Sequence, residues 1–280
     1  MLAGILAGPV LFSTLAWGYT ETRSLCVTHT QFIDESLPSS FDSYRLALIG
    51  GLHLKKIGTF EKRIQHILAE NSPDILLVAG NIKPSHGADN QFVHGLLNEF
   101  LAPLQFPDGI LAVRGYHDRK HFWDQIPEGA GYRLLSNSHF AIQRRQDCLA
   151  FVGIQSPHAS HLDRGQNQLR ESLRNCPPSS YRIWLGQSPD MLRIAQGFPL
   201  NLIVAVDNLH HQVRIPGYGV LRRDSKVPAA WQYSWLQEGH LFLYLSPGVG
   251  TRGIPLRFFM RPELAFIDLK KAAPLKQVPR

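Results

Sequence analysis

Short apolar runs alternate with helical patterns in the first part of the chain. The expected strands span residues 44–49, 75–78 and 110–113, and their unbroken apolar character suits strands covered on both faces. One helix is predicted between the first two runs and another between the last two, from apolar residues at helical spacing: Phe60, Ile64, Ile67 and Leu68, then Phe92, Leu96, Leu97, Phe100 and Leu101. This order predicts parallel strand pairing with right-handed crossovers.

The second half of the chain is richer in strand patterns. Strands are expected at residues 141–142, 149–154, 181–185, 202–206, 240–245 and 264–267. Helices are expected at about 162–173 and 189–197. The pattern predicts an α/β domain over residues 44–269, with a lead-in strand and linker at 21–43 before it and a basic tail at 270–280 after it.

An apolar segment precedes the lead-in strand. Residues 2–19 carry no charge, and Trp17 and Tyr19 lie where an interfacial aromatic belt would be. Residues 1–20 are therefore predicted to form a single N-terminal membrane anchor. The segment is short for a spanning helix and contains Pro9, and Thr14-Leu15-Ala16 resembles a cleavage site although a positive n-region is lacking, so a cleaved or re-entrant segment and a buried hydrophobic arm remain as alternatives. Arg23, just after it, favours a cytoplasmic domain.

Charge narrows the classes of partner. The chain has 29 Lys and Arg against 22 Asp and Glu, a net charge of +7, which favours anionic partners such as acidic lipid head groups. The basic residues are scattered and form no aromatic-rich basic segment, so nucleic acid is not expected as a partner. The cysteines offer neither a zinc spacing nor a disulfide framework: Cys26, Cys148 and Cys176.

Five short polar segments follow the expected strands. They hold, in order, Gly51 and His53; Gly80 and Asn81; Gly115, Tyr116, His117 and Asp118; Gln187 and Asp190; and Asp207, Leu209, His210 and His211. In this order they resemble the metal-binding motifs of calcineurin-like metallophosphoesterases. The residues at 244–250 and 255–264 resemble the end of the membrane-anchored bacterial branch of that family. The resemblance covers roughly residues 1–269 and implies a four-layer α/β/β/α sandwich.

The resemblance also identifies the positions that would hold metal. These former metal-site positions are Gly51, His53, Asn81, Tyr116, Gln187, Asp207 and Leu209. Only His53 is the residue that the family pattern expects. A dinuclear site needs a bridging carboxylate to relieve the repulsion between two cations, and the amide of Asn81 carries no charge. No metal cofactor is therefore expected, and an active protein would need a divalent ion such as Mn, Mg or Zn.

Two further chemical possibilities remain at these segments. A single metal ion bound by His53, Asp207, His210 and His211 is an alternative to solvated or packed histidines. His117 and Asp118 are the catalytic candidates, because the resemblance implies a histidine that helps protonate the leaving group and an aspartate that orients it. An inherited structural hydrogen bond in a turn is the other interpretation of this pair.

The sequence thus predicts a metallophosphoesterase-like protein that is catalytically impaired or inactive. It would bind a phosphorylated or lipid-linked ligand, or a protein partner, at a membrane. One alternative is an active phosphohydrolase that acts on a lipid-linked phosphoester or pyrophosphate through a non-standard metal site. A second alternative is a structural partner of an active paralogue.

Overall fold

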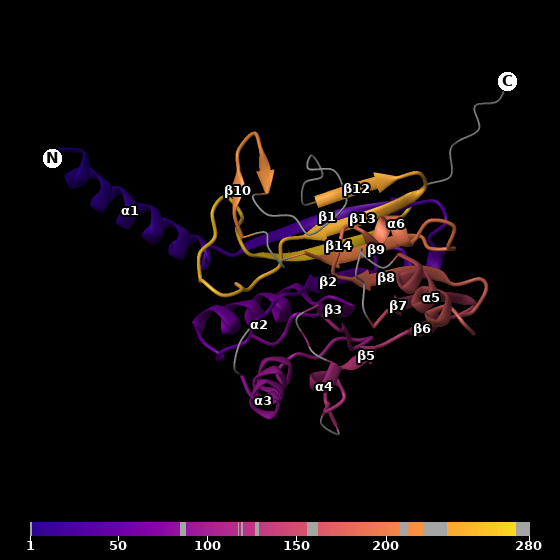
Figure 1. Cartoon of the computed structure of the whole chain (residues 1–280). Helices are drawn as coiled ribbons and strands as arrows, with labels where there is room; N and C mark the ends of the chain where they lie inside the picture. Colours follow the sequence, from indigo (N-terminus) through magenta and orange to yellow (C-terminus); the bar gives the residue numbers. More distant parts are fainter. Residues whose placement is uncertain are drawn as a thin grey trace.

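The computed structural model describes residues 2–84, 88–116, 118, 120–126, 129–155, 162–207, 212–220 and 234–272. Two six-stranded sheets face each other at its centre (Figure 1). The first sheet has the order β1-β14-β2-β3-β4-β5, with bounds Cys26–Asp34, Glu263–Lys271, Arg45–Ile49, Ile75–Ala79, Ile110–Val113 and Arg133–Leu135. The expected parallel pairing holds for β2, β3 and β4.

The second sheet has the order β12-β13-β9-β8-β7-β6. Its strands are Ser234–Glu238, Leu241–Ser246, Leu202–Val206, Tyr181–Gly186, Asp147–Gly153 and Ser138–Arg144. Here β7, β8, β9 and β13 run parallel to one another. A separate hairpin pairs β10 (Arg214–Ile215) with β11 (Gly219–Val220).

Helices cover the outer faces of the two sheets. Helices α2 (Thr59–Asn71) and α3 (Asn90–Leu101) pack on the first sheet, and α5 (Leu162–Ser172) and α6 (Met191–Ile194) pack on the second. The structure also has a short helix α4 (Lys120–Trp123) and a 3-10 turn at Ser39–Phe41. The protein is therefore a four-layer α/β/β/α sandwich, as the sequence predicted.

Side-chain alternation along the strands builds three apolar interfaces. On β2, Leu46 and Leu48 face the core between the sheets, whereas Ala47 and Ile49 face α2 and α3. On β8, Ile183 faces the inter-sheet core and Trp184 faces α5 and α6. Because each strand is covered on both sides, its pattern in the sequence is a continuous apolar run rather than an alternation.

Most predicted elements are confirmed, and the differences are local. Helix α6 ends at Ile194, so the predicted extension to residue 197 is wrong; Gly197 adopts φ 80° just beyond it, a conformation incompatible with a continuing helix. The sequence also missed β5, α4 and the short strands from β10 to β12. Strand β1, expected as a lead-in, forms the edge of the first sheet and pairs with β14 from Cys26 to Asp34.

Helix α1 (Leu2–Glu21) extends away from the sandwich (Figure 1). Its last turn is docked on the loop before β14: the N–H of Arg257 donates to the Gly18 carbonyl at 3.0 Å, and the N–H of Met260 donates to Glu21 Oε1 at 2.7 Å. Trp17 packs edge-on against Phe258 and Phe259. In the part of the chain that the structure describes, no helix is both long and apolar enough to cross a membrane.

Candidate functional site

Five of the former metal-site positions lie at one edge of the sandwich. His53, Asn81 and Tyr116 follow the carboxyl ends of β2, β3 and β4, and Gln187 and Asp207 follow β8 and β9. Parallel strands place their carboxyl ends at the same edge of a sheet, and ligand sites of α/β proteins form there. The sequence placed all five residues correctly with respect to the strand ends.

Close backbone approaches hold the first three loops together. A Cβ atom on Gly80 would lie 2.3 Å from the Gly115 nitrogen, so no other residue fits between these loops. The N–H of Gly51 donates to the Gly80 carbonyl at 2.8 Å, and the N–H of His53 donates to the Asn81 carbonyl at 3.0 Å. His53 and Asn81 both adopt positive φ, 44° and 52°, an uncommon conformation that the paired loops maintain.

His53 is buried and its ring is oriented by the neighbouring loop. Its Nδ1 donates to the Lys83 carbonyl at 3.0 Å, which leaves Nε2 as the unprotonated nitrogen of the neutral ring. The pKa of His53 is lowered to about 4, chiefly by burial and to a smaller extent by the positive charges of Arg252, Arg257 and Lys55, whereas the Lys83 hydrogen bond acts in the opposite direction. The surroundings of this ring are therefore electropositive.

The buried Asp118 carboxylate connects the loop after β3 to the loop after β4. Its carboxylate is fully buried and accepts the N–H groups of Lys83 and Gly115, each at 3.0 Å. Burial raises the pKa of Asp118, and these hydrogen bonds act in the opposite direction. The predicted partner of this carboxylate, His117, lies outside the described residues, so their pairing stays a prediction.

Gln187 links the two sheets where the resemblance places a metal-binding histidine. Its Oε1 accepts the N–H of Tyr116 at 2.8 Å, and its Nε2 donates to the Ala79 carbonyl. Both ends of the amide thus bond to the backbone of the first sheet's loops. Gln187 itself is buried, whereas the Tyr116 side chain is 49% exposed and lies at the surface.

Asp207 completes the described part of the edge. It is buried, and its N–H donates to the Ser246 carbonyl at the end of β13. Leu209, His210 and His211 lie outside the described residues, so the predicted mononuclear site of His53 and Asp207 with these histidines stays a prediction.

Arg257 was not among the predicted site residues. Its side chain is fully buried and donates to the carbonyls of Pro247, Gly248, Gly250 and Met260. These bonds fold the segment between β13 and β14 onto the first loop, where the N–H of Gly250 donates to the Gly51 carbonyl at 2.9 Å. An isolated arginine in a loop has no periodic pattern, so the sequence gives no signal for this role.

Two bacterial proteins are similar to this chain over nearly its whole length. "Uncharacterized metallophosphoesterase YkuE" of Bacillus subtilis is 24% identical over 280 residues, which are 95% of this chain and 94% of that protein. The "Uncharacterized metallophosphoesterase" of Aquifex aeolicus is 24% identical over 91% of this chain and 95% of its own length. The chain is therefore a relative of these metallophosphoesterases.

Another relative is longer than this chain. The zebrafish "Transmembrane protein with metallophosphoesterase domain" is 25% identical over 85% of this chain, and the match covers 56% of that protein. No family model matches this metallophosphoesterase relative.

The donor set does not fit the two divalent ions that the family name leads one to expect. Gly51 has no side chain, Asn81 supplies a neutral amide, and the amide of Gln187 is used between the sheets. Among the described residues, no three His, Cys, Asp or Glu side chains gather as a metal site.

Proposed function

We propose that this metallophosphoesterase relative is catalytically impaired and binds a phosphorylated ligand in the former catalytic cleft. The observation that carries the proposal is the Gln187 amide. The resemblance places a metal-binding histidine at this position, and both ends of the amide bond to the protein backbone. These contacts hold the two sheets together, and an amide nitrogen lacks the lone pair with which an imidazole binds an ion.

The charge beside His53 supports an anionic ligand. A cavity of about 160 Å³ lies there and is lined by residues that include His53, Arg23, Lys55 and Lys56, with Glu61 as the acidic member. Where the family places cations between the protein and a phosphate, this chain offers fixed positive side chains instead. Ammonium and guanidinium groups donate charge-assisted hydrogen bonds to phosphate oxygens without an intervening metal.

Metal content and turnover test the impaired state directly. The purified full chain, after incubation with Mn²⁺ and desalting, should hold far fewer ions than the two per chain of a dinuclear site. It should not hydrolyse bis(p-nitrophenyl) phosphate above the background of a preparation from cells that lack the gene. Two bound ions together with hydrolysis that Asp207→Ala abolishes would establish the active phosphohydrolase instead.

Membrane attachment is the second part of the proposal. Most exposed large apolar side chains among the described residues lie on α1 or close to its end: Val10, Leu11, Phe12, Leu15, Trp17, Tyr19, Ile215, Tyr218, Ile254 and Phe259. Such a concentration is typical of a surface that contacts a membrane or a partner. The zebrafish relative is itself named a transmembrane protein.

Flotation with phospholipid vesicles tests the attachment. The natural chain should float with the vesicles, and Phe12→Glu together with Leu15→Glu should release it, because charged side chains on this surface oppose entry into lipid. Ile33→Glu is the matched control, since Ile33 is an equally exposed apolar residue on β1, away from α1. Flotation that the double substitution leaves unchanged would contradict the proposed role of α1.

A further inference from the structure

The cavity beside His53 also borders the end of α1. Thr22 and Arg23, which directly follow α1, line it together with Lys55 and Lys56 from the loop after β2. Its volume of about 160 Å³ lies below the roughly 300–1,000 Å³ that is typical of sites for drug-sized ligands. The cavity therefore fits a phosphate group with its adjoining carbon and is too small for a nucleotide or a sugar.

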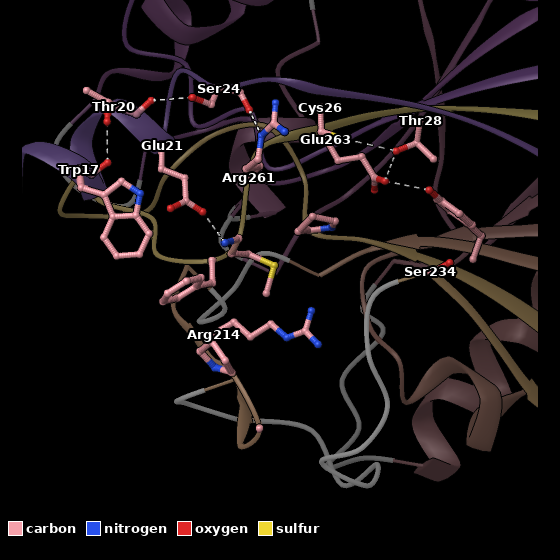
Figure 2. A pocket seen from close by; sticks show the side chains of 16 residues that line it. Trp17, Thr20, Glu21, Ser24, Cys26, Thr28, Arg214, Ser234, Arg261 and Glu263 are labelled. Atoms are coloured by element: carbon pink, nitrogen blue, oxygen red, sulfur yellow. Dashed lines mark hydrogen bonds between the residues drawn. The ribbon is translucent and has the colours of Figure 1, made fainter. Parts of the chain in front are cut away.

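The segment that carries Arg23 is held on the sandwich. Neighbouring residues of the same segment line a second cavity, of about 880 Å³, which Figure 2 shows with Glu21 and Ser24 in its wall. There Arg261 Nε donates to the Ser24 carbonyl at 2.9 Å, and Glu21 Oε1 accepts the N–H of Met260 at 2.7 Å. These contacts fix the end of α1 and thereby place Arg23 at the smaller cavity.

The charged side chains around the smaller cavity favour an anion with two charges. Its described wall residues include three exposed cations, Arg23, Lys55 and Lys56, and one carboxylate, Glu61, which gives a net charge of +2 with His53 neutral. In the part of the chain that the structure describes, no hydrogen bond or salt bridge engages the ammonium groups of the two lysines. Both ammonium groups are thus accessible to a ligand.

A phosphomonoester matches this charge. It carries about two negative charges at pH 7, and its three terminal oxygens accept charge-assisted hydrogen bonds from ammonium and guanidinium groups. A phosphodiester, such as that of phosphatidylglycerol, cannot take a second negative charge. The cavity therefore favours a terminal phosphate over a bridging one.

Exposed aromatic and apolar residues adjoin the wall of this cavity. Arg23 Nη2 donates to the hydroxyl of Tyr19, an exposed residue of α1, at 3.3 Å, and this neutral partner leaves the positive charge of Arg23 uncompensated. In the loop before β14, Ile254 is 70% exposed and precedes Pro255 of the cavity wall. Tyrosine is enriched at the level of lipid head groups. With α1 in a membrane, the cavity would lie at the depth of the lipid phosphates.

We propose that this cavity binds the phosphomonoester head group of a membrane lipid of the phosphatidic acid type. The phosphate oxygens accept hydrogen bonds from Lys55, Lys56 and Arg23, and the glycerol lies toward Tyr19 and Ile254. The inference rests on the proposed phosphate binding and membrane attachment, and it names the class of the ligand and its source, the bilayer around α1.

Lipid retention by the full chain tests the class of the ligand. The protein is purified in a non-ionic detergent, mixed with equal amounts of phosphatidic acid, phosphatidylglycerol and phosphatidylcholine that carry identical acyl chains, and analysed by native mass spectrometry. Retained phosphatidic acid should exceed retained phosphatidylglycerol by at least about tenfold, the factor expected from one additional charge-assisted hydrogen bond. Equal retention of these two lipids, or a preference for phosphatidylglycerol, would overturn the proposal.

Competition with glycerol 3-phosphate tests the source of the ligand. This compound has the same phosphomonoester and no acyl chains. Displacement of half of the retained phosphatidic acid should need at least about a hundredfold molar excess, because the acyl chains hold the lipid head group at the protein at a high effective concentration. Displacement by an equal amount would overturn the lipid source and leave the binding of a phosphorylated ligand standing.

Variants locate the preference within the cavity. Lys55→Gln together with Lys56→Gln removes two cations from its wall, so the ratio of phosphatidic acid to phosphatidylglycerol should fall to about one. Lys62→Gln together with Arg63→Gln is the matched control, because it removes two cations from exposed positions of α2 that do not line the cavity, and it should leave the ratio unchanged. An undiminished ratio in the first pair, or an equal fall in both pairs, would overturn the site.

The outcomes separate this inference from the proposed function. Equal retention of the lipids by a chain that still floats with vesicles would remove the head-group site and leave the membrane attachment standing. A natural chain that does not float would contradict the attachment itself.

Discussion

Gln187 Oε1 accepts the backbone N–H of Tyr116 at 2.8 Å, and this single contact joins the loop after β8 to the loop after β4. The other end of the same amide donates to the Ala79 carbonyl at the end of β3. The two sheets are thus connected through a protein side chain at the edge where a metallophosphoesterase would connect them through metal ions. The Gln187 amide is thus a direct cross-link between the two sheets at this edge.

Gln187→Ala should therefore cost more than the loss of an average polar side chain. The N–H of Tyr116 and the buried carbonyl of Ala79 each lose this hydrogen bond, which predicts a decrease of roughly 2–4 kcal/mol in the free energy of unfolding. Urea denaturation followed by circular dichroism measures the decrease. Gln143→Ala is the control, because Gln143 is exposed on β6, and it should change stability by less than about 0.5 kcal/mol. A similar small change for Gln187→Ala would show that the cross-link is unimportant.

Partial restoration of the ligand set should restore some metal binding. Asn81→Asp combined with Gln187→His would add a carboxylate and an imidazole at the edge that already contains His53 and Asp207. We expect the variant to bind Mn²⁺ at least about tenfold more tightly than the natural chain, measured by isothermal titration calorimetry.

A matched control separates site restoration from added negative charge. Asn167→Asp places the same new carboxylate on the exposed face of α5 and should leave Mn²⁺ affinity unchanged. If the double variant binds no better than this control, the edge lacks the geometry of a metal site even with ligand-type residues in place.

The sequence predicted the central strands well because burial on both faces leaves a simple signal. The apolar run at 110–113 coincides with β4, and the run at 202–206 coincides with β9. The strands it missed are short and partly exposed, such as Arg214–Ile215, whose pairing depends on tertiary contacts rather than on local pattern. The sequence also located the site, because each of the five polar segments follows the end of an expected strand.

The roles of the site residues were harder to predict than their places. Nothing local to Gln187 shows that its amide bonds to Tyr116 and Ala79, which are 71 and 108 residues away in the chain. Likewise, Asp118 was assigned to the orientation of a catalytic histidine, and only the folded chain shows that it accepts the N–H groups of Lys83 and Gly115. Such contacts are long-range consequences of the fold.

His53 should make the stability of the protein dependent on pH. The folded state lowers the pKa of this histidine from 6.5 to about 4, so the unfolded chain binds a proton at a higher pH than the folded chain does. The contribution of neutral His53 to stability is complete well above pH 6.5 and is lost as the pH falls toward 4. Between about pH 7.5 and about pH 5 the free energy of unfolding should decrease by about 2 kcal/mol through this residue.

The contribution of His53 is isolated by comparison with His53→Gln, which cannot titrate. Urea denaturation at both pH values should show a fall in stability for the natural chain that is about 2 kcal/mol larger than the fall for the variant. His66→Gln, a substitution of an exposed histidine on α2, should retain the full fall. Equal pH dependence in the natural chain and His53→Gln would contradict the buried neutral state of His53.

The contact between Gly18 and Phe258 should decide whether α1 stays docked on the sandwich. A Cβ atom at Gly18 would lie 2.4 Å from Phe258 Cζ, so Gly18→Leu forces the two segments apart, whereas Gly8→Leu adds the same side chain where no atom lies within 4 Å. The N–H of Arg257 donates to the Gly18 carbonyl at 3.0 Å and reports on the docking. Its hydrogen exchange should accelerate by at least about tenfold in Gly18→Leu and remain unchanged in Gly8→Leu. Unchanged protection in both variants would mean that Phe258 moves aside at little cost, and that α1 is held by Trp17 and Glu21 instead.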